Sequence, residues 1–155
     1  MAAQAYKFSF VTSRMSSLSA NEAKYLRDHV CSQYGAFRMM VTNFLKGKMD
    51  HEDDVCLTFI YNWGNIVGWV LVDPKGSYKE IPHGGANLMF YVLPAFRKMG
   101  LAEGAIRHIV SHLKSFDKLY SYAFKEDHVI YFFKKMSNRF GLNIEICEPI
   151  LYLEK

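Results

Sequence analysis

The sequence predicts one mixed α/β domain whose strands and helices follow the order β-αα-βββ-α-β-α-ββ. Two observations carry this prediction: a β-rich hairpin over residues 55–72, and an apolar strand that enters an amphipathic helix through a glycine turn over residues 87–113. A further strand follows that helix, so the strands before and after it are expected to lie parallel. The chain of 155 residues is 50% hydrophobic and has no proline- or glycine-rich linker, so residues 1–155 are expected to form a single domain.

The first strand is predicted from alternating side-chain polarity, and the first helix from a capping signal. Residues 5–11 alternate between side chains of different polarity, as in a strand that buries one face. The side chains on that face are Tyr6, Phe8 and Phe10. Ser19 and Glu22 have the spacing of a capping box, in which the serine hydroxyl accepts from the Glu22 amide and the Glu22 side chain reaches back. The helix that begins there is expected to run to about Gln33, burying Ala23, Leu26 and Val30.

Residues 37–86 are expected to add a second helix, an acidic loop, a hairpin and a long connection. The second helix covers residues 37–45. Residues 50–54 hold four acids and a histidine, without the glycine and spacing of a calcium loop, and this composition is typical of a solvated loop. Two β-rich runs, 55–61 and 66–72, flank the turn-forming residues 62–65.

The centre of the chain has the features of a phosphate-binding strand, turn and helix. An apolar strand runs from Leu88 to Leu93 and stops at Pro94. The chain then passes through the basic turn at residues 97–100. Apolar side chains then recur at helical spacing, at Leu101, Ala102, Ala105, Ile106, Ile109, Val110 and Leu113. The first amides of a helix have no intrahelical acceptor, and the helix dipole favours an anion beside them.

The C-terminal third predicts a strand, a helix and two final strands. Residues 119–124 form the first of these strands, and a helix begins at Glu126 or Asp127 and ends near Gly141. The apolar side chains of this helix are Val129, Ile130, Phe132, Phe133 and Met136. The last two strands, 143–147 and 150–153, are separated by Pro149.

Composition limits the kinds of partner and compartment. The net charge of +4 suits an anionic coenzyme as well as nucleic acid, and the chain has no long basic stripe with interleaved aromatics, so nucleic acid is not expected. No apolar run approaches the roughly 18 residues that span a bilayer, and the N-terminus lacks a secretory pattern. The three cysteines, Cys31, Cys56 and Cys147, lie in apolar patterns, as expected for reduced thiols of a cytoplasmic protein.

The central stretch resembles the acetyl-CoA signature of the GNAT superfamily of N-acetyltransferases. That signature is a strand ending in V-x-P, an aromatic residue, and then [QR]-x-x-G-x-[GA]. The matching residues here are Val92, Pro94, Phe96, Arg97, Gly100 and Ala102. The resemblance implies a mostly antiparallel sheet of six to seven strands, flanked by about four helices.

The resemblance also implies where acetyl-CoA binds. The diphosphate is expected on the amides of residues 98–102, and the pantetheine arm is expected to pair with the strand equivalent to residues 90–92. An amide of that strand would polarise the thioester carbonyl. The implied coenzyme contacts are Phe90, Tyr91, Val92, Arg97, Lys98, Met99, Gly100, Leu101, Ala102 and Phe133. No metal is expected.

The catalytic machinery departs from the family pattern. Many GNAT enzymes carry a tyrosine near the sulfur on the helix after the fifth strand, and Phe133 takes its place here. Tyr131 is the best remaining proton donor, although it lies about 200° around the helix from that position. For the base, the alternatives left open are Tyr122, Glu80, His83 and a water molecule.

Three functions remain open from the sequence. The main hypothesis is acetyl transfer from acetyl-CoA to a primary amine of a small molecule or a protein, by direct transfer in a ternary complex. The second is a catalytically weakened GNAT-like module that binds acyl-CoA and acts through protein or nucleic-acid interaction. The third is a basic α/β domain that binds nucleic acid. His108 and His112 have the spacing of zinc ligands, but no third ligand is evident, so both are expected to face solvent. Whether the protein forms a homodimer is left open.

Overall fold

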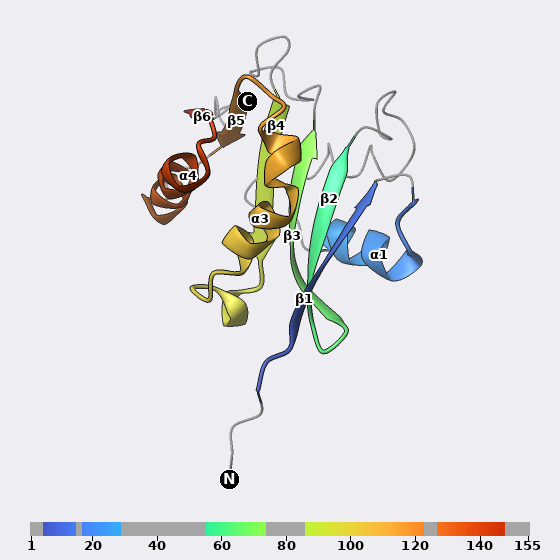
Figure 1. Ribbon diagram of the computed structural model, residues 1–155. Coiled ribbons are helices and arrows are strands. Elements are labelled where there is room, and N and C mark those ends of the chain that lie inside the picture. Colours follow the sequence, from blue (N-terminus) through green and yellow to red (C-terminus); the bar gives the residue numbers. More distant parts are fainter. Residues whose placement is uncertain (1–4, 15–16, 29–54, 74–85, 123–126, 148–155) are drawn as a thin grey trace, which may run out of the picture. The chain divides into compact units, whose positions relative to one another are not determined.

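The computed structural model describes residues 5–14, 17–28, 55–73, 86–122 and 127–147 (Figure 1). The elements in chain order are β1 (Phe8–Arg14), α1 (Ala20–Asp28), β2 (Cys56–Asn62), β3 (Asn65–Asp73), β4 (Ala86–Val92), the 3-10 turn η3 (Pro94–Phe96), α3 (Leu101–Leu113), β5 (Leu119–Tyr122), α4 (Asp127–Phe140) and β6 (Ile144–Cys147). The predicted helix at 37–45, the acidic residues 50–54, the connection at 74–85 and the strand at 150–153 lie outside the described residues.

The described strands form one six-stranded sheet in the order β1-β2-β3-β4-β5-β6. β1 runs antiparallel to β2, with Phe8 opposite Asn62 and Arg14 opposite Cys56. β4 pairs in parallel with β5, and β5 pairs in parallel with β6. The mixed α/β class is therefore confirmed, and so is the parallel pair on either side of α3.

The chain divides into two compact units. Unit 1 comprises Met1–Leu71 and Phe90–Ile109, and unit 2 comprises Val72–Met89 and Val110–Lys155. That residues 1–155 act as a single domain remains a prediction.

In unit 1, α1 and the first turns of α3 cover opposite faces of the strands. Phe10 lies opposite Ile60 in the β1–β2 ladder, so both point to one face. A Cβ added at Gly104 of α3 would lie 2.7 Å from the Phe10 ring, which places α3 on that face. Tyr61 is the next residue after Ile60, points to the other face, and donates a hydrogen bond to Glu22 of α1.

The buried side chains of unit 1 follow this arrangement. β2 and β3 form a continuous apolar layer that includes Leu57, Phe59 and Trp69, each no more than 1% exposed. On α1, Leu26 is fully buried, whereas Ala23 is only partly covered, and Val30 lies outside the described residues. The predicted apolar positions of α3 up to Ile109 are buried, and of the two that belong to unit 2, Leu113 is buried and Val110 is half-buried.

In unit 2, α4 packs its apolar face inward and ends at a glycine. Phe133 and Met136 are 2% and 0% exposed. Gly141 has a φ of +66° just past the end of the helix, where glycine commonly closes a helix. The chain then returns to the sheet, where the Leu119 amide donates to the Asn143 carbonyl at 2.7 Å.

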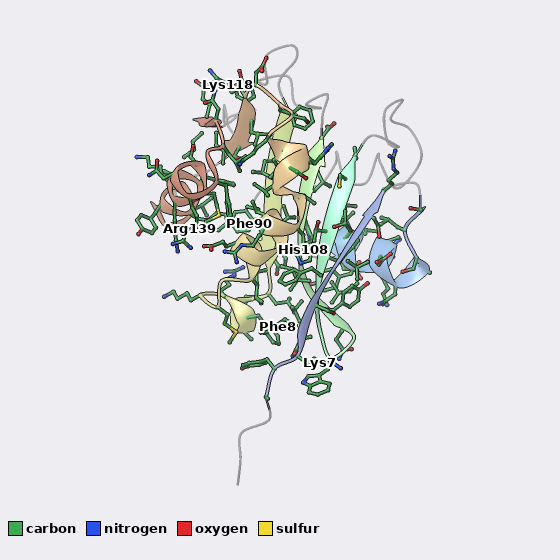
Figure 2. The ribbon with its side chains drawn as sticks, viewed as in Figure 1. Lys7, Phe8, Phe90, His108, Lys118 and Arg139 are labelled. Atoms are coloured by element: carbon green, nitrogen blue, oxygen red, sulfur yellow. The ribbon has the colours of Figure 1, made fainter. Side chains whose placement is uncertain are left out.

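β1 begins and ends three residues later than the sequence predicts. The reason lies at the start of the strand, where Lys7 joins the hairpin turn (Figure 2). The Lys7 amide donates to Asn62 Oδ1 at 3.0 Å, and the Trp63 amide donates to the Lys7 carbonyl at 2.9 Å. At the other end, polar residues extend the ladder, with Thr12 and Thr58 sharing a hydrogen bond of 2.9 Å between their hydroxyls.

The close approach of β3 and β4 depends on Gly68. A Cβ there would lie 2.6 Å from the Tyr91 carbonyl oxygen and 3.2 Å from the Val92 Cα atom. We expect Gly68→Ala to lower the free energy of unfolding by about 1–3 kcal/mol, because backbone atoms must move apart. Denaturant unfolding measures this change.

Gly104→Ala is the matched control, because its Cβ would meet the tip of the Phe10 ring rather than backbone. The ring can rotate away, and alanine gains roughly 1 kcal/mol of helix propensity over glycine. We therefore expect Gly104→Ala to lose less free energy of unfolding than Gly68→Ala. Equal stability of Gly68→Ala and the wild type would contradict the proposed closeness of the two strands.

Candidate functional site

The site is built where β4 ends and α3 begins. At the end of β4, the Leu93 amide donates to the Val67 carbonyl at 2.9 Å, which holds the strand end against β3. Pro94 then starts one 3-10 turn, in which the Phe96 amide donates to the Leu93 carbonyl at 2.9 Å. Proline suits the first position of such a turn because its fixed φ is already helical and it has no amide to satisfy.

The turn before α3 uses two left-handed residues. Lys98 has a φ of +64° and Gly100 a φ of +75°. At Gly100 this conformation favours glycine, because any other residue is disfavoured there by about 1–2 kcal/mol. The first helical hydrogen bond of α3 runs from the Gly104 amide to the Gly100 carbonyl at 3.0 Å, so the amides of residues 101–103 have no acceptor within the helix.

The space beside Gly100 is open. A Cβ added there would meet no atom within 4 Å. Outward amides, the positive end of the helix dipole and open space are together the requirements for binding an anion. The turn can therefore hold a phosphate or diphosphate group.

Arg97 is turned back onto the strand. Its Nε donates to the Val92 carbonyl at 2.8 Å, and its guanidinium lies 5.8 Å from the centre of the Tyr91 ring. Sequence reasoning treated Arg97 as positive charge for the coenzyme and missed this hydrogen bond. No signal in the sequence distinguishes an arginine that caps a strand from one that faces a ligand.

A match over most of the chain places it in a family. Residues 23–137 match the acetyltransferase (GNAT) family. The chain belongs to that family. The predicted GNAT membership and acyltransferase class are confirmed. A search of curated proteins found no match.

Solved structures share the GNAT fold with this chain at low sequence identity. The aminoglycoside N-acetyltransferase AAC(6')-Iy in complex with CoA has a TM-score of 0.55 and 16% identity, over 100% of this chain and 99% of that one. A ribosomal-protein-alanine N-acetyltransferase from Brucella melitensis biovar Abortus 2308 has a TM-score of 0.55 and 15% identity, over 84% and 90% of the two chains. At this identity the likeness shows the fold.

Nine of the ten predicted coenzyme contacts fall in unit 1. Phe90 and Tyr91 are half-buried, and Val92 is 7% exposed. The side chains of Arg97, Lys98 and Met99 are exposed, whereas Leu101 and Ala102 are buried in the core. Leu101 and Ala102 can therefore reach a ligand through their backbone amides, while their side chains hold the helix in place.

The remaining predicted residues lie on α4, in unit 2. Phe133 is buried, and its ring lies 5.5 Å from the ring of Phe132 in a T-shaped arrangement. Tyr131 is 70% exposed. Their predicted roles beside the coenzyme and at the departing sulfur stay predictions. Glu80, His83 and the side chain of Tyr122 lie outside the described residues.

The two histidines of α3 are exposed and lie against aromatic rings. His108 (Figure 2) contacts Phe10 at 4.8 Å between ring centres. His112 contacts Phe116 at 5.4 Å between ring centres. Among the described residues, no three metal-ligating side chains gather into one group. Likewise, no described helix is long and apolar enough to cross a membrane.

Sequence reasoning missed a polar cluster on the face of unit 1 that α1 covers. The Tyr61 hydroxyl donates to Glu22 Oε2 at 2.9 Å, and the Ser19 amide donates to Glu22 Oε1 at 3.0 Å. The predicted capping box is therefore confirmed, with the Glu22 amide donating to Ser19 Oγ at 3.1 Å. The contact with Tyr61 joins residues 39 positions apart, which no local pattern reveals.

Two phenols of this cluster resist ionisation. Burial, the hydrogen bond to Glu22 and the charge of that carboxylate together raise the pKa of Tyr61 to about 12. Burial also raises the pKa of Tyr25, and the charge of Tyr91 adds to that effect. Both hydroxyls therefore stay protonated at neutral pH.

The raised pKa of Tyr61 predicts a loss of stability in strong alkali. Between about pH 10 and 12 the folded protein keeps a proton that the unfolded chain releases, so this contribution is full below pH 10 and is lost as the pH rises through 12. We expect the free energy of unfolding to fall less steeply over this range in Tyr61→Phe than in the wild type. Denaturant unfolding at several pH values measures the two slopes, and identical slopes would contradict the assignment.

Proposed function

We propose that the protein transfers an acetyl group from acetyl-CoA to a primary amine, by direct attack within a ternary complex, and that residues 1–155 act as one domain. The observation that carries this proposal is the turn at residues 97–100. Left-handed Gly100, the amides of residues 101–103 and the open space beside them meet the needs of the coenzyme diphosphate. Family membership supports the identification of that anion.

The pantetheine arm is proposed to add to β4 as a short extra strand. It would pair with the main chain of residues 90–92, with hydrogen bonds giving affinity. β5 pairs in register with the first two residues of β4, Ala86 and Asn87, and the Ser121 hydroxyl donates to the Leu88 carbonyl at 2.9 Å. The proposed pantetheine segment is the second half of β4, beyond these contacts.

The chemistry requires a neutral amine and a protonated thiol. The amine nitrogen attacks the thioester carbon, the new C–N bond forms, the C–S bond breaks, and the proton lost by nitrogen ends on sulfur or on water. An amide of β4 would stabilise the charge that develops on the carbonyl oxygen. Tyr131 is the proposed donor to sulfur, and a water molecule can carry the proton from the amine.

The acceptor is proposed only as a class. The names of two structural neighbours give an aminoglycoside and a ribosomal-protein alanine as what those proteins act on. Small-molecule amines and protein amines are both consistent with a GNAT fold. The acceptor is therefore a primary amine of either kind.

A second function is favoured by one observation on α4. Phe133 stands where the resemblance expects a tyrosine, and a phenyl ring has no proton to give. A GNAT-like module that binds acyl-CoA with weakened turnover fits this change. Such a module would act by binding a protein or a nucleic acid.

Two assays separate these functions. Calorimetric titration should show acetyl-CoA binding at tens of micromolar or tighter, and no binding would contradict both. Thiol release with a broad panel of amines and peptides should show amine-dependent turnover. Tight coenzyme binding with no turnover on any member of the panel would favour the binding module.

The turn is tested by placing a carboxylate on it. Gly100→Glu adds side-chain bulk and a negative charge where the diphosphate is proposed to lie, so we expect at least a hundredfold loss of acetyl-CoA affinity by calorimetry. The control is Gly64→Glu, at another left-handed glycine (φ +80°) of unit 1 with no atom within 4 Å of an added Cβ. It carries similar strain and the same charge, and should bind normally. Equal affinities of the two variants for acetyl-CoA would show that the diphosphate does not bind at this turn.

A further inference from the structure

Three aromatic side chains of unit 1 form a partly exposed cluster at the start of β1. Alternation predicts a buried face that includes Tyr6, but that side chain is 56% exposed. Phe8 and Phe96 are half-buried beside it. The Tyr6 and Phe8 rings stack at 5.3 Å between centres, and both meet the Phe96 ring edge to face, at 5.9 Å and 6.3 Å. These three residues are called the aromatic cluster below.

The outer face of the Tyr6 ring is left open by the other two rings of the cluster. The three ring centres lie at similar distances from one another, between 5.3 Å and 6.3 Å. Phe96 therefore lies beside the stacked pair and not on the side of Tyr6 that faces away from Phe8. The cluster holds one flat apolar ring in a fixed position with one face turned outward.

Contacts along β1 place the aromatic cluster beyond the N-terminal end of α3. The Phe10 ring lies against the position of Gly104, in the first turn of that helix. Phe8 lies about 7 Å back along the strand, and its ring meets Phe96, which precedes the helix (Figure 2). Only about 4.5 Å of helix separates Gly104 from Leu101. The cluster therefore extends past the first amides of α3, on the side toward which those amides point.

A flat apolar surface beside an anion site has the chemistry of a nucleotide site. The diphosphate of acetyl-CoA carries the pantetheine arm at one end and adenosine at the other, so a purine base lies one ribose away from it. The arm is proposed to follow residues 90–92, which leaves the adenosine end free to reach the cluster. Stacking of a base on an aromatic side chain strengthens binding by roughly fivefold to a hundredfold.

We propose that the adenine base of the coenzyme stacks on the outer face of Tyr6, with Phe8 and Phe96 holding that ring in place. This inference rests on the proposed binding of acetyl-CoA at the turn before α3. It adds a third point of attachment for the coenzyme, besides the turn and β4. Tyr6 acts in binding and takes no part in acetyl transfer.

The competing role for Tyr6 is structural, as an apolar contact that holds the start of β1. Two substitutions separate the roles. Tyr6→Leu keeps an apolar side chain against Phe8 but removes the flat ring, whereas Tyr6→Phe keeps the ring and removes only the hydroxyl.

Trp63→Leu is the matched control on the other face of the strand. Trp63 is 53% exposed, and Lys7 Nζ lies 5.4 Å from the centre of its ring. Because successive side chains of an extended segment point to opposite faces, Lys7 lies on the face opposite to Tyr6. The Trp63 indole also donates to the Ala5 carbonyl at 2.8 Å. This variant therefore removes an exposed ring and loosens the start of β1 without touching the cluster.

The test is calorimetric titration of each variant with CoA and with 4'-phosphopantetheine, which keeps the arm and one phosphate but lacks adenosine. We expect Tyr6→Leu to weaken CoA binding at least about fivefold, and Tyr6→Phe and Trp63→Leu to stay within about twofold of the wild type. All four proteins should bind 4'-phosphopantetheine equally. In proton NMR, the adenine H2 and H8 resonances of bound CoA should move upfield in the wild type, under the ring current of Tyr6, and not in Tyr6→Leu.

The inference is overturned if Tyr6→Leu binds CoA as tightly as the wild type. It is also overturned if this variant loses affinity equally for CoA and 4'-phosphopantetheine, because that result marks a structural role. A dimer of the wild type in sedimentation that Tyr6→Leu abolishes, with CoA affinity unchanged, would assign the surface to a second copy of the chain instead. Normal CoA binding by every variant contradicts this inference alone, whereas no CoA binding by the wild type contradicts the proposed function as well.

Discussion

The structure of the candidate site depends on how the chain leaves β4 and enters α3. Eight residues, 93–100, separate the strand from the helix. Within them the Arg97 side chain donates to the Val92 carbonyl at 2.8 Å, and two residues adopt left-handed backbone conformations. This turn sets the direction of α3 and leaves its first amides facing outward. The proposed coenzyme site therefore depends on a backbone constraint more than on any charged side chain.

The role of Arg97 illustrates that point. A helix N-terminus supplies donors and a positive potential from the backbone alone. The side chain of Arg97 is therefore available to fix the end of β4 and to lie over Tyr91.

The sequence was sufficient for features determined by neighbours in the chain. The strand, turn and helix around Gly100, the β2–β3 hairpin and the capping box all depend on residues within a few positions of one another, and the structure contains them. The shifted start of β1 was not predictable, because Lys7 is held by the hairpin turn 55 residues away. The same limit hid the link between Glu22 and Tyr61, since a β-rich run gives no sign that one of its residues will meet a helix cap.

The diphosphate turn can be tested directly by backbone amide NMR. Titration with CoA should move the amide resonances of residues 98–102 strongly downfield, as new hydrogen bonds to phosphate oxygens form. Titration with pantetheine, which lacks the diphosphate, should leave those resonances nearly unchanged while perturbing residues 90–92. Shifts at residues 98–102 that are the same with both ligands, or absent with CoA, would contradict a phosphate-binding role for the start of α3.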